Sequence, residues 1–174
     1  MSKSALKNQL ISLTKGQIIE QVLDLYDNCK PAKEYLEYFL NPNEKEMFEK
    51  YKVIIINEFY PKGKYVLPRT RFSVAKKAIA DFRVLHSSPE LLGDLMLTLV
   101  ENACNFTFDY GDMSEQYYNS AYNNFKAVLQ YLKKTDLLEH FKLRCVECLN
   151  WSKDCGYGFT DEMSQLFYDY YEED

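Results

Sequence analysis

Residues 88–100, Ser-Pro-Glu-Leu-Leu-Gly-Asp-Leu-Met-Leu-Thr-Leu-Val, decide the fold of this chain. The side chain of Ser88 can accept a hydrogen bond from a free amide at a helix start, and Pro89 suits the first helical position, where no amide donor is needed. The apolar residues that follow lie on nearly every side of a helix. A helix without a polar face lies in the middle of its domain. The sequence therefore predicts a central helix over about 89–108.

The rest of the chain carries the same kind of helix start. Thr14 precedes Gln17 by three residues, which is the spacing of a capping box. Asn41 and Thr160 each stand in front of apolar residues spaced three or four apart. The expected helices cover about 3–13, 15–29, 31–39, 42–60, 72–86, 89–108, 113–133, 136–154 and 161–172. We therefore predict an all-α chain, a single domain over residues 1–174 with eight or nine helices packed as irregular antiparallel hairpins around the central helix.

Charge is distributed unevenly along the chain. Residues 1–87 carry 15 Lys and Arg against 10 Asp and Glu, whereas residues 88–174 carry 6 against 16. The net charge of -5 therefore conceals a basic half and an acidic half. Either the two halves attract each other within the fold, or they present surfaces of opposite sign to a partner.

The composition excludes a secreted or membrane-spanning protein as the expected class. The first residues mix Lys7, Asn8 and Gln9 with leucines, unlike the continuous apolar core of a signal peptide. The longest apolar-rich run, Leu91–Val100, is far shorter than the ~20 residues that span a bilayer. We expect a cytoplasmic protein that uses no membrane and whose five cysteines are free thiols.

Three cysteines near the C-terminus raise the question of a zinc site. Cys145, Cys148 and Cys155 follow His140. If one helix continues through them, Cys148 and Cys155 lie about 10.5 Å apart along its axis, too far for zinc–sulfur bonds of about 2.3 Å. The cysteines fall on an apolar face and fit better as small buried hydrophobes. Since no nucleophile has a local histidine partner either, the sequence predicts no metal ligand, no cofactor and no catalytic residue.

Four polar residues are candidates for a pocket. Glu58 and Asn102 each fall among the apolar residues of their predicted helix. A carboxylate in such a place must be paired or hydrogen-bonded, and candidate partners for Glu58 include Arg69 and Arg71. The set forms either a polar pocket for a ligand or a group of internal hydrogen bonds that fixes the helices. Its members are Glu58, Asp81, Asn102 and Asp112.

Segment 62–83 is the most basic part of the chain, with seven cations and one acid, Asp81. Phosphate backbones attract cations, and the interleaved aromatic residues Tyr65 and Phe72 can stack on bases. The pI of about 5.2 argues the other way, since nucleic-acid-binding domains are usually strongly basic. In the alternative interpretation, this segment docks on the acidic half of the chain or on a partner. The cations are Lys62, Lys64, Arg69, Arg71, Lys76, Lys77 and Arg83.

Several short runs resemble a known family when they are taken together. They are Asn57-Glu58-Phe59-Tyr60-Pro61, Ala78-Ile79-Ala80-Asp81-Phe82, Leu99-Val100-Glu101-Asn102, Tyr110-Gly111-Asp112 and Gly156-Tyr157-Gly158-Phe159, with Leu13 to Tyr26 and Phe39-Leu40-Asn41-Pro42 before them. The chain resembles, over nearly its whole length, an uncharacterised bacterial family that is catalogued only as a domain of unknown function. The resemblance implies a small, stand-alone, cytoplasmic helical protein. It implies no activity, cofactor or catalytic residue.

These observations favour a non-enzymatic, scaffold-type helical domain that binds another protein or itself. One alternative is a nucleic-acid-associated protein that uses segment 62–83, for which a salt-dependent electrophoretic shift would be evidence. A second alternative is a small-ligand-binding protein or an enzyme, for which a deep polar pocket around Glu58 would be evidence.

Overall fold

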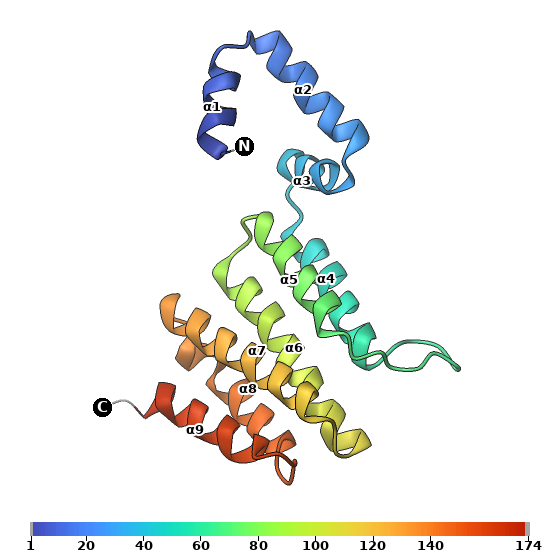
Figure 1. Ribbon diagram of the computed structural model, residues 1–174, viewed down its shortest axis with the longest axis vertical. Coiled ribbons are helices and arrows are strands. Elements are labelled where there is room, and N and C mark those ends of the chain that lie inside the picture. The colour runs from blue at the N-terminus through green and yellow to red at the C-terminus, as the bar shows by residue number, and fades with distance from the viewer. Residues whose placement is uncertain (1, 173–174) are drawn as a thin grey trace. The chain divides into compact units, whose positions relative to one another are not determined.

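The computed structural model describes residues 2–172, and within them the chain forms nine helices and no strand (Figure 1). The predicted all-α fold is therefore confirmed. The helices are α1 Lys3–Ile11, α2 Lys15–Asn28, α3 Lys30–Leu40, α4 Glu44–Phe59, α5 Phe72–Val84, α6 Pro89–Tyr110, α7 Glu115–Lys134, α8 Leu138–Trp151 and α9 Phe159–Tyr171.

The chain divides into two compact units, Met1–Asn43 and Glu44–Asp174. Helices α1 to α3 belong to the first unit and helices α4 to α9 to the second. The single domain expected over residues 1–174 stays a prediction. Each unit is described by itself.

The first unit is a short helical segment in which α2 and α3 contact each other. Tyr26 on α2 donates a hydrogen bond to the Glu37 carboxylate on α3 at 3.0 Å. The predicted capping box is confirmed, because the Thr14 hydroxyl accepts from the Gln17 amide while the Gln17 side chain accepts from the Thr14 amide. No side chain of α1, α2 or α3 is fully buried. The predicted apolar faces of these three helices are therefore at most half-buried.

The second unit is built around α6, as the sequence predicts. Helix α6 packs against α4, α5, α7 and α8, while α9 packs on α7 and α8 (Figure 1). The Ser88 hydroxyl caps α6 by accepting from the Leu91 amide at 3.3 Å. Leu95, Leu97 and Leu99 lose all contact with solvent, although Leu97 lies on the opposite side of the helix from Leu95 and Leu99. An all-round apolar helix is stable here because neighbouring helices cover each of its sides.

Helix boundaries differ from the prediction at two proposed caps. Asn41 does not begin a helix; it ends α3, where its amide donates to the Glu37 carbonyl at 3.0 Å. Thr160 lies inside α9, and its hydroxyl donates to the Ser152 carbonyl at 2.7 Å. Local spacing does not indicate that a hydroxyl donates to a distant carbonyl instead of capping the start of its own helix.

Two segments with alternating or β-branched apolar residues, 106–110 and 65–67, form no strand. Helix α6 continues through Phe106 and Phe108 to Tyr110, where Gly111 ends it with a φ of 91°. The segment Tyr65–Leu67 lies in the loop between α4 and α5 and forms no strand. Tyr65 and Leu67 are exposed in that loop.

Candidate functional site

Glu58 lies near the end of α4, and its carboxylate is held by Arg71 at the start of α5. The guanidinium donates two hydrogen bonds, from Nε to Oε2 at 2.9 Å and from Nη2 to Oε1 at 2.7 Å. The Arg71 amide adds a third, to Oε2 at 3.2 Å. The hydrogen bonds from the Arg71 side chain hold the pKa of Glu58 below its ordinary value, although burial opposes the shift. Arg71 is thus one of the partners that the sequence offers for Glu58.

The same residue also fixes the backbone of the loop that follows α4. The Glu58 carbonyl accepts from the Arg69 amide at 2.9 Å and from the Thr70 amide at 2.8 Å. At the other end of the loop, Tyr60 donates to the Asp109 carboxylate on α6 at 2.8 Å. Burial, followed by this hydrogen bond, raises the pKa of Tyr60. Glu58 therefore holds the loop at its base.

A cavity of about 240 Å³ lies beside Glu58, between the end of α4 and the loop. Lys62 and Arg69 contribute cations to its lining, and Val66 and Leu67 contribute apolar side chains. Because the Glu58 carboxylate is engaged by Arg71, the charged side chains that remain available in the cavity are cations, and they stand beside apolar ones.

The other three members of the predicted pocket have partners of their own. Asp81 accepts from Lys77, one turn away on α5, and the Asn102 side chain donates to the Thr98 carbonyl on α6. No hydrogen bond described in residues 2–172 joins two members of the predicted set, and only Glu58 lines a cavity described there. Glu58, Asp81, Asn102 and Asp112 therefore each make an internal contact, and their shared pocket stays a prediction.

Asp112 connects the α6–α7 loop with the α8–α9 connection through hydrogen bonds. Its carboxylate accepts from the hydroxyl of Tyr118 on α7 and from the Gly156 amide, at 3.2 Å, in the α8–α9 connection. The Tyr118 hydroxyl in turn accepts from the Met113 amide at 3.0 Å. The hydrogen bond from Tyr118 lowers the pKa of Asp112, and that from Gly156 adds to the shift. A Cβ at Gly156 would lie 3.0 Å from the carboxylate, so glycine permits this close approach.

The seven cations of segment 62–83 do not form one continuous patch of free charge. Two of them are engaged by carboxylates, Arg71 by Glu58 and Lys77 by Asp81 at 2.9 Å. Within residues 2–172, no carboxylate contacts Lys76 or Arg83. The remaining cations lie in the loop between α4 and α5 and are Lys62, Lys64 and Arg69.

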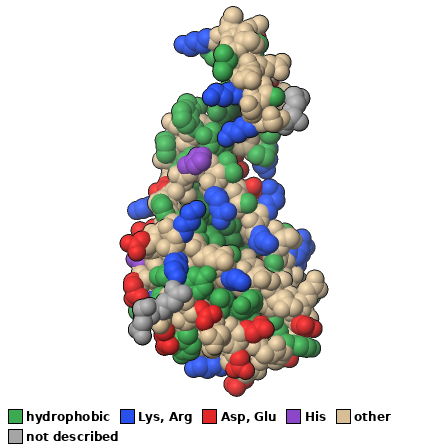
Figure 2. Space-filling model, turned by 60° about the vertical axis from the view of Figure 1, so that its left-hand side comes forward, with side chains coloured by type: hydrophobic (Ala, Val, Ile, Leu, Met, Phe, Trp, Pro, Cys, Tyr) green, Lys and Arg blue, Asp and Glu red, His purple; other side chains and the backbone are tan. Residues whose placement is uncertain are grey.

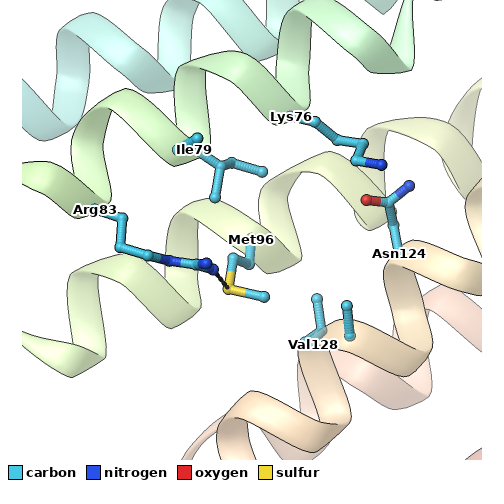
Figure 3. Close-up of a pocket in the computed structure, with 8 residues that line it drawn as sticks. Lys76, Ile79, Arg83, Met96, Asn124 and Val128 are labelled. Carbon is cyan, nitrogen blue, oxygen red and sulfur yellow. Dashed lines mark hydrogen bonds between the residues drawn. The ribbon is translucent and has the colours of Figure 1, made fainter. Parts of the chain in front are cut away.

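A groove runs over α6 between α5 and α7 and contains two hollows, of about 550 and about 240 Å³, that share Lys76 and Asn124 in their lining. Figure 3 shows Lys76 on α5 and Asn124 on α7 pointing toward each other, with Arg83 reaching the Met96 sulfur at 3.6 Å. Cations, hydroxyls and amides form the polar lining, and none of the lining residues is acidic. We call this the α5–α7 groove. Its residues are Phe72, Ser73, Lys76, Lys77, Ile79, Ala80, Arg83, Met96, Ser120, Asn123, Asn124, Ala127 and Val128.

Another hollow, lined by α7 and α9, has the opposite charge. It measures about 330 Å³, and Asp161, Glu162 and Asp169 supply its charged residues. Tyr122, Gln165 and Leu166 complete the lining, which contains no cation. Helix α7 thus borders a basic groove together with α5 and an acidic one together with α9.

The described ion pairs stay within the basic half or within the acidic half of the sequence. Every ion pair described in residues 2–172 joins two residues of 1–87 or two residues of 88–174. In the view of Figure 2, Lys and Arg side chains gather over the middle of the face, whereas most Asp and Glu side chains lie lower. The described ion pairs thus give no support to attraction between the two halves within the fold.

Of the three cysteines near the C-terminus, two behave as core residues. Cys145 and Cys148 on α8 are buried, and burial raises the pKa of the Cys145 thiol to about 11 and that of Cys148 well above its ordinary value. Cys155 lies beyond the end of α8 and is half-buried, so one helix does not continue through all three. No group of three or more His, Cys, Asp and Glu residues among those described is placed to hold a metal ion.

One polar cluster was not predicted from the sequence. Arg144 on α8 donates to the Glu101 carboxylate on α6 at 2.6 and 2.7 Å and lies 2.7 Å from the Asp94 carboxylate on the same helix. Burial opposes the charge of Arg144, but these two carboxylates raise its pKa. Asp94 and Glu101 are seven residues apart and therefore lie on one side of α6, which is the one signal that the sequence contains.

Comparison with known proteins gives a family but no activity. Neither the curated proteins nor the solved structures contain a match to this chain. Among the described residues, no helix has the length and apolar character that crossing a membrane requires. A family model matches residues 1–170, which confirms the resemblance to an uncharacterised family. The chain belongs to DUF6155, a family of unknown function.

Proposed function

We propose that this protein is a non-enzymatic interaction domain whose α5–α7 groove binds an acidic segment of a protein partner. The composition of the lining carries the proposal: Lys76 and Arg83, which have no carboxylate partner among the described residues, stand among hydroxyl and amide side chains, and no lining residue is acidic. A cytoplasmic, bacterial setting, which the resemblance implies, is part of the proposal.

The donors of the groove fit carboxylates. Lys76 and Arg83 have no carboxylate partner among the described residues, so a partner's acid would not compete with an internal ion pair. The side-chain amides of Asn123 and Asn124, on the opposite wall, each donate one N–H to a carbonyl of α7 and keep a second N–H for a partner. Ion pairs of exposed side chains are individually weak, so we expect affinity to come from several of them acting together.

The floor of the groove is apolar. Ile79 and Met96 are buried there, and Val128 on α7 borders the same hollow. A groove with an apolar floor and charged walls fits an amphipathic helix, which places apolar side chains on the floor and acids against the walls.

Nucleic acid is a less favourable ligand of the α5–α7 groove than an acidic protein segment. Arg71 and Lys77, two of the seven cations in segment 62–83, are engaged by carboxylates. The net charge of -5 also repels a phosphate backbone at long range. A small ligand at Glu58 has less support still, because Arg71 occupies that carboxylate.

Fluorescence anisotropy tests the proposal. The probes are a labelled amphipathic helical peptide with glutamates on its polar face, the same peptide with glutamine at those positions, and a single-stranded oligonucleotide. We expect the protein to bind the glutamate peptide alone, and Lys76→Glu/Arg83→Glu to abolish binding. Lys45→Glu/Lys153→Glu changes the net charge equally at exposed positions outside the groove and should preserve it.

Two results would overturn the proposal. Equal binding of the glutamate and glutamine peptides would show that the cations do not recognise the partner. Preferential binding of the oligonucleotide, lost in Lys76→Glu/Arg83→Glu, would assign the groove to nucleic acid instead.

A further inference from the structure

Helix α9 presents an acidic face to solvent. Asp161, Glu162, Asp169 and Glu172 are exposed, while Met163 and its apolar neighbours pack into the core. Within residues 2–172 no cation forms an ion pair with any of these four carboxylates. Asp161 and Glu162 are favoured in the first turn of a helix by its dipole, but this reason does not extend to Asp169 and Glu172 at the other end.

The spacing of these acids matches that of the groove cations. Lys76 and Arg83 are seven residues apart on α5, and Glu162 and Asp169 are seven residues apart on α9. Both pairs lie in a single helix, so each spans about 10.5 Å at about 1.5 Å per residue. Two helices laid side by side can therefore match both charges at once.

We infer that the α5–α7 groove of one copy binds the acidic face of α9 of a second copy, an inference that rests on the function proposed above. The occupant follows from charge complementarity: the acid-free groove and the cation-free hollow of α7 and α9 belong to the same chain. Because the apolar side of α9 packs in its own core, this contact uses the charged walls of the groove and not its apolar floor.

This contact joins two different surfaces, so it is heterologous. Each copy in a complex keeps one free groove or one free α9 face, and the assembly continues until it closes into a ring or grows as a chain. Because the contact depends on exposed charges, salt weakens it; the Debye length falls from about 10 Å at about 0.1 M to about 3 Å at about 1 M.

Charge-reversal variants of the full chain test the inference by sedimentation velocity and light scattering. At low salt we expect the wild-type protein to exceed its monomer mass of 20.6 kDa in a concentration-dependent way, and high salt to return it to the monomer. Lys76→Glu/Arg83→Glu and Glu162→Lys/Asp169→Lys should each be monomeric alone. The control Lys45→Glu/Lys153→Glu should associate like the wild type.

Mixing the two monomeric variants gives the decisive result. The intact groove of Glu162→Lys/Asp169→Lys accepts the intact acidic face of Lys76→Glu/Arg83→Glu, and the reversed groove of the second variant accepts the reversed face of the first. We expect the equimolar mixture to regain the concentration-dependent association of the wild type, with the two variants alternating in the assembly. The chain with all four substitutions should associate again through the exchanged charges. Circular dichroism establishes that each variant is folded.

The inference and the proposed function fail in different ways. If the wild-type protein is monomeric at low salt, or the mixed variants do not pair, the second copy is not the occupant. In that case groove-dependent binding of the glutamate peptide would still support an acidic partner of another kind. If the protein neither self-associates nor binds the glutamate peptide through the groove, the proposed function is refuted as well.

Discussion

Replacing Arg144 by methionine tests how α8 is held to the central helix α6. The guanidinium contacts the carboxylates of Glu101 and Asp94 at 2.6 to 2.7 Å, and the side chains of these two acids are only 18% and 24% exposed. Methionine fills much of the same volume but leaves two partly buried negative charges without a cation. Breaking a fully buried pair costs about 3–5 kcal/mol.

The partial exposure of this cluster lowers that value, so we expect a loss of about 2–4 kcal/mol in the free energy of unfolding. For a chain of this length, such a loss corresponds to a fall in Tm of roughly 4–16 °C. Urea denaturation and thermal melts followed by circular dichroism measure both quantities. Lys142→Met is the matched control, since Lys142 on the same helix meets an exposed carboxylate at 3.5 Å and contributes within about 1 kcal/mol.

Removing the stranded charges separates electrostatics from packing. If the cost comes from the unpaired carboxylates, adding Asp94→Asn and Glu101→Gln to Arg144→Met should recover most of the lost stability, because neutral amides are cheaper to bury. An Arg144→Met variant as stable as the wild type would refute the reasoning. A loss that the additional substitutions leave unchanged would show that the stem of the arginine, and not its charge, stabilises α8.

Other substitutions and treatments probe the loop, the packing of α6 and the thiols. Glu58→Gln should lower Tm at neutral pH and speed tryptic cleavage of the loop after α4; because the pKa of Glu58 is lowered in the folded state, the Tm difference should shrink as pH falls below its unfolded value of about 4.3. Gly93→Val should destabilise by about 1–3 kcal/mol, since a Cβ there already lies 3.0 Å from Leu132, and a melt at the wild-type temperature would contradict this packing. Iodoacetamide at pH about 8 should leave Cys145 and Cys148 unmodified until urea is added, because burial disfavours their thiolates. Mass spectrometry measures the modification, and a labelled Cys145 or Cys148 in the native protein would contradict the prediction.

The helices are readable from the sequence because their causes are local. Thr14 with Gln17 and Ser88 with Pro89 mark helix starts within four residues, and the apolar period extends each helix from there. Asn41 misleads because a helix-capping residue type can also end a helix, as it does at α3. The burial of Glu58 is likewise predicted, since it falls on the apolar face of its own helix.

The groove and the polar cluster of Arg144 are not readable in the same way. Arg144 and Glu101 are 43 residues apart in the chain, and no local spacing indicates which carboxylate an arginine reaches across two helices. The α5–α7 groove exists because the two helices lie on α6 with their polar residues Lys76 and Asn124 turned toward each other (Figure 3). Its lining depends on how three helices pack, and the sequence supplies only the excess of positive charge in segment 62–83.

The runs that resemble the family are largely accounted for by the fold. Glu58 holds a loop, Glu101 holds α8 through Arg144, and Asp112 joins two loops through the Gly156 amide. These side chains have their hydrogen-bonding capacity engaged within the chain. The recognition of a partner that we propose therefore uses exposed side chains outside those runs.

The distribution of exposed charge is consistent with this division of roles. Lys76 and Arg83 flank the run of residues 78–82 without belonging to it, and Glu162 and Asp169 lie beyond the last run. Substituting these four residues removes charge from the surface, and the internal contacts that it removes are those of Arg83 with the Met96 sulfur and of Gln165 with Asp169. A partner that recognises them can vary while the architecture stays the same, because the buried contacts and the surface contacts use separate residues.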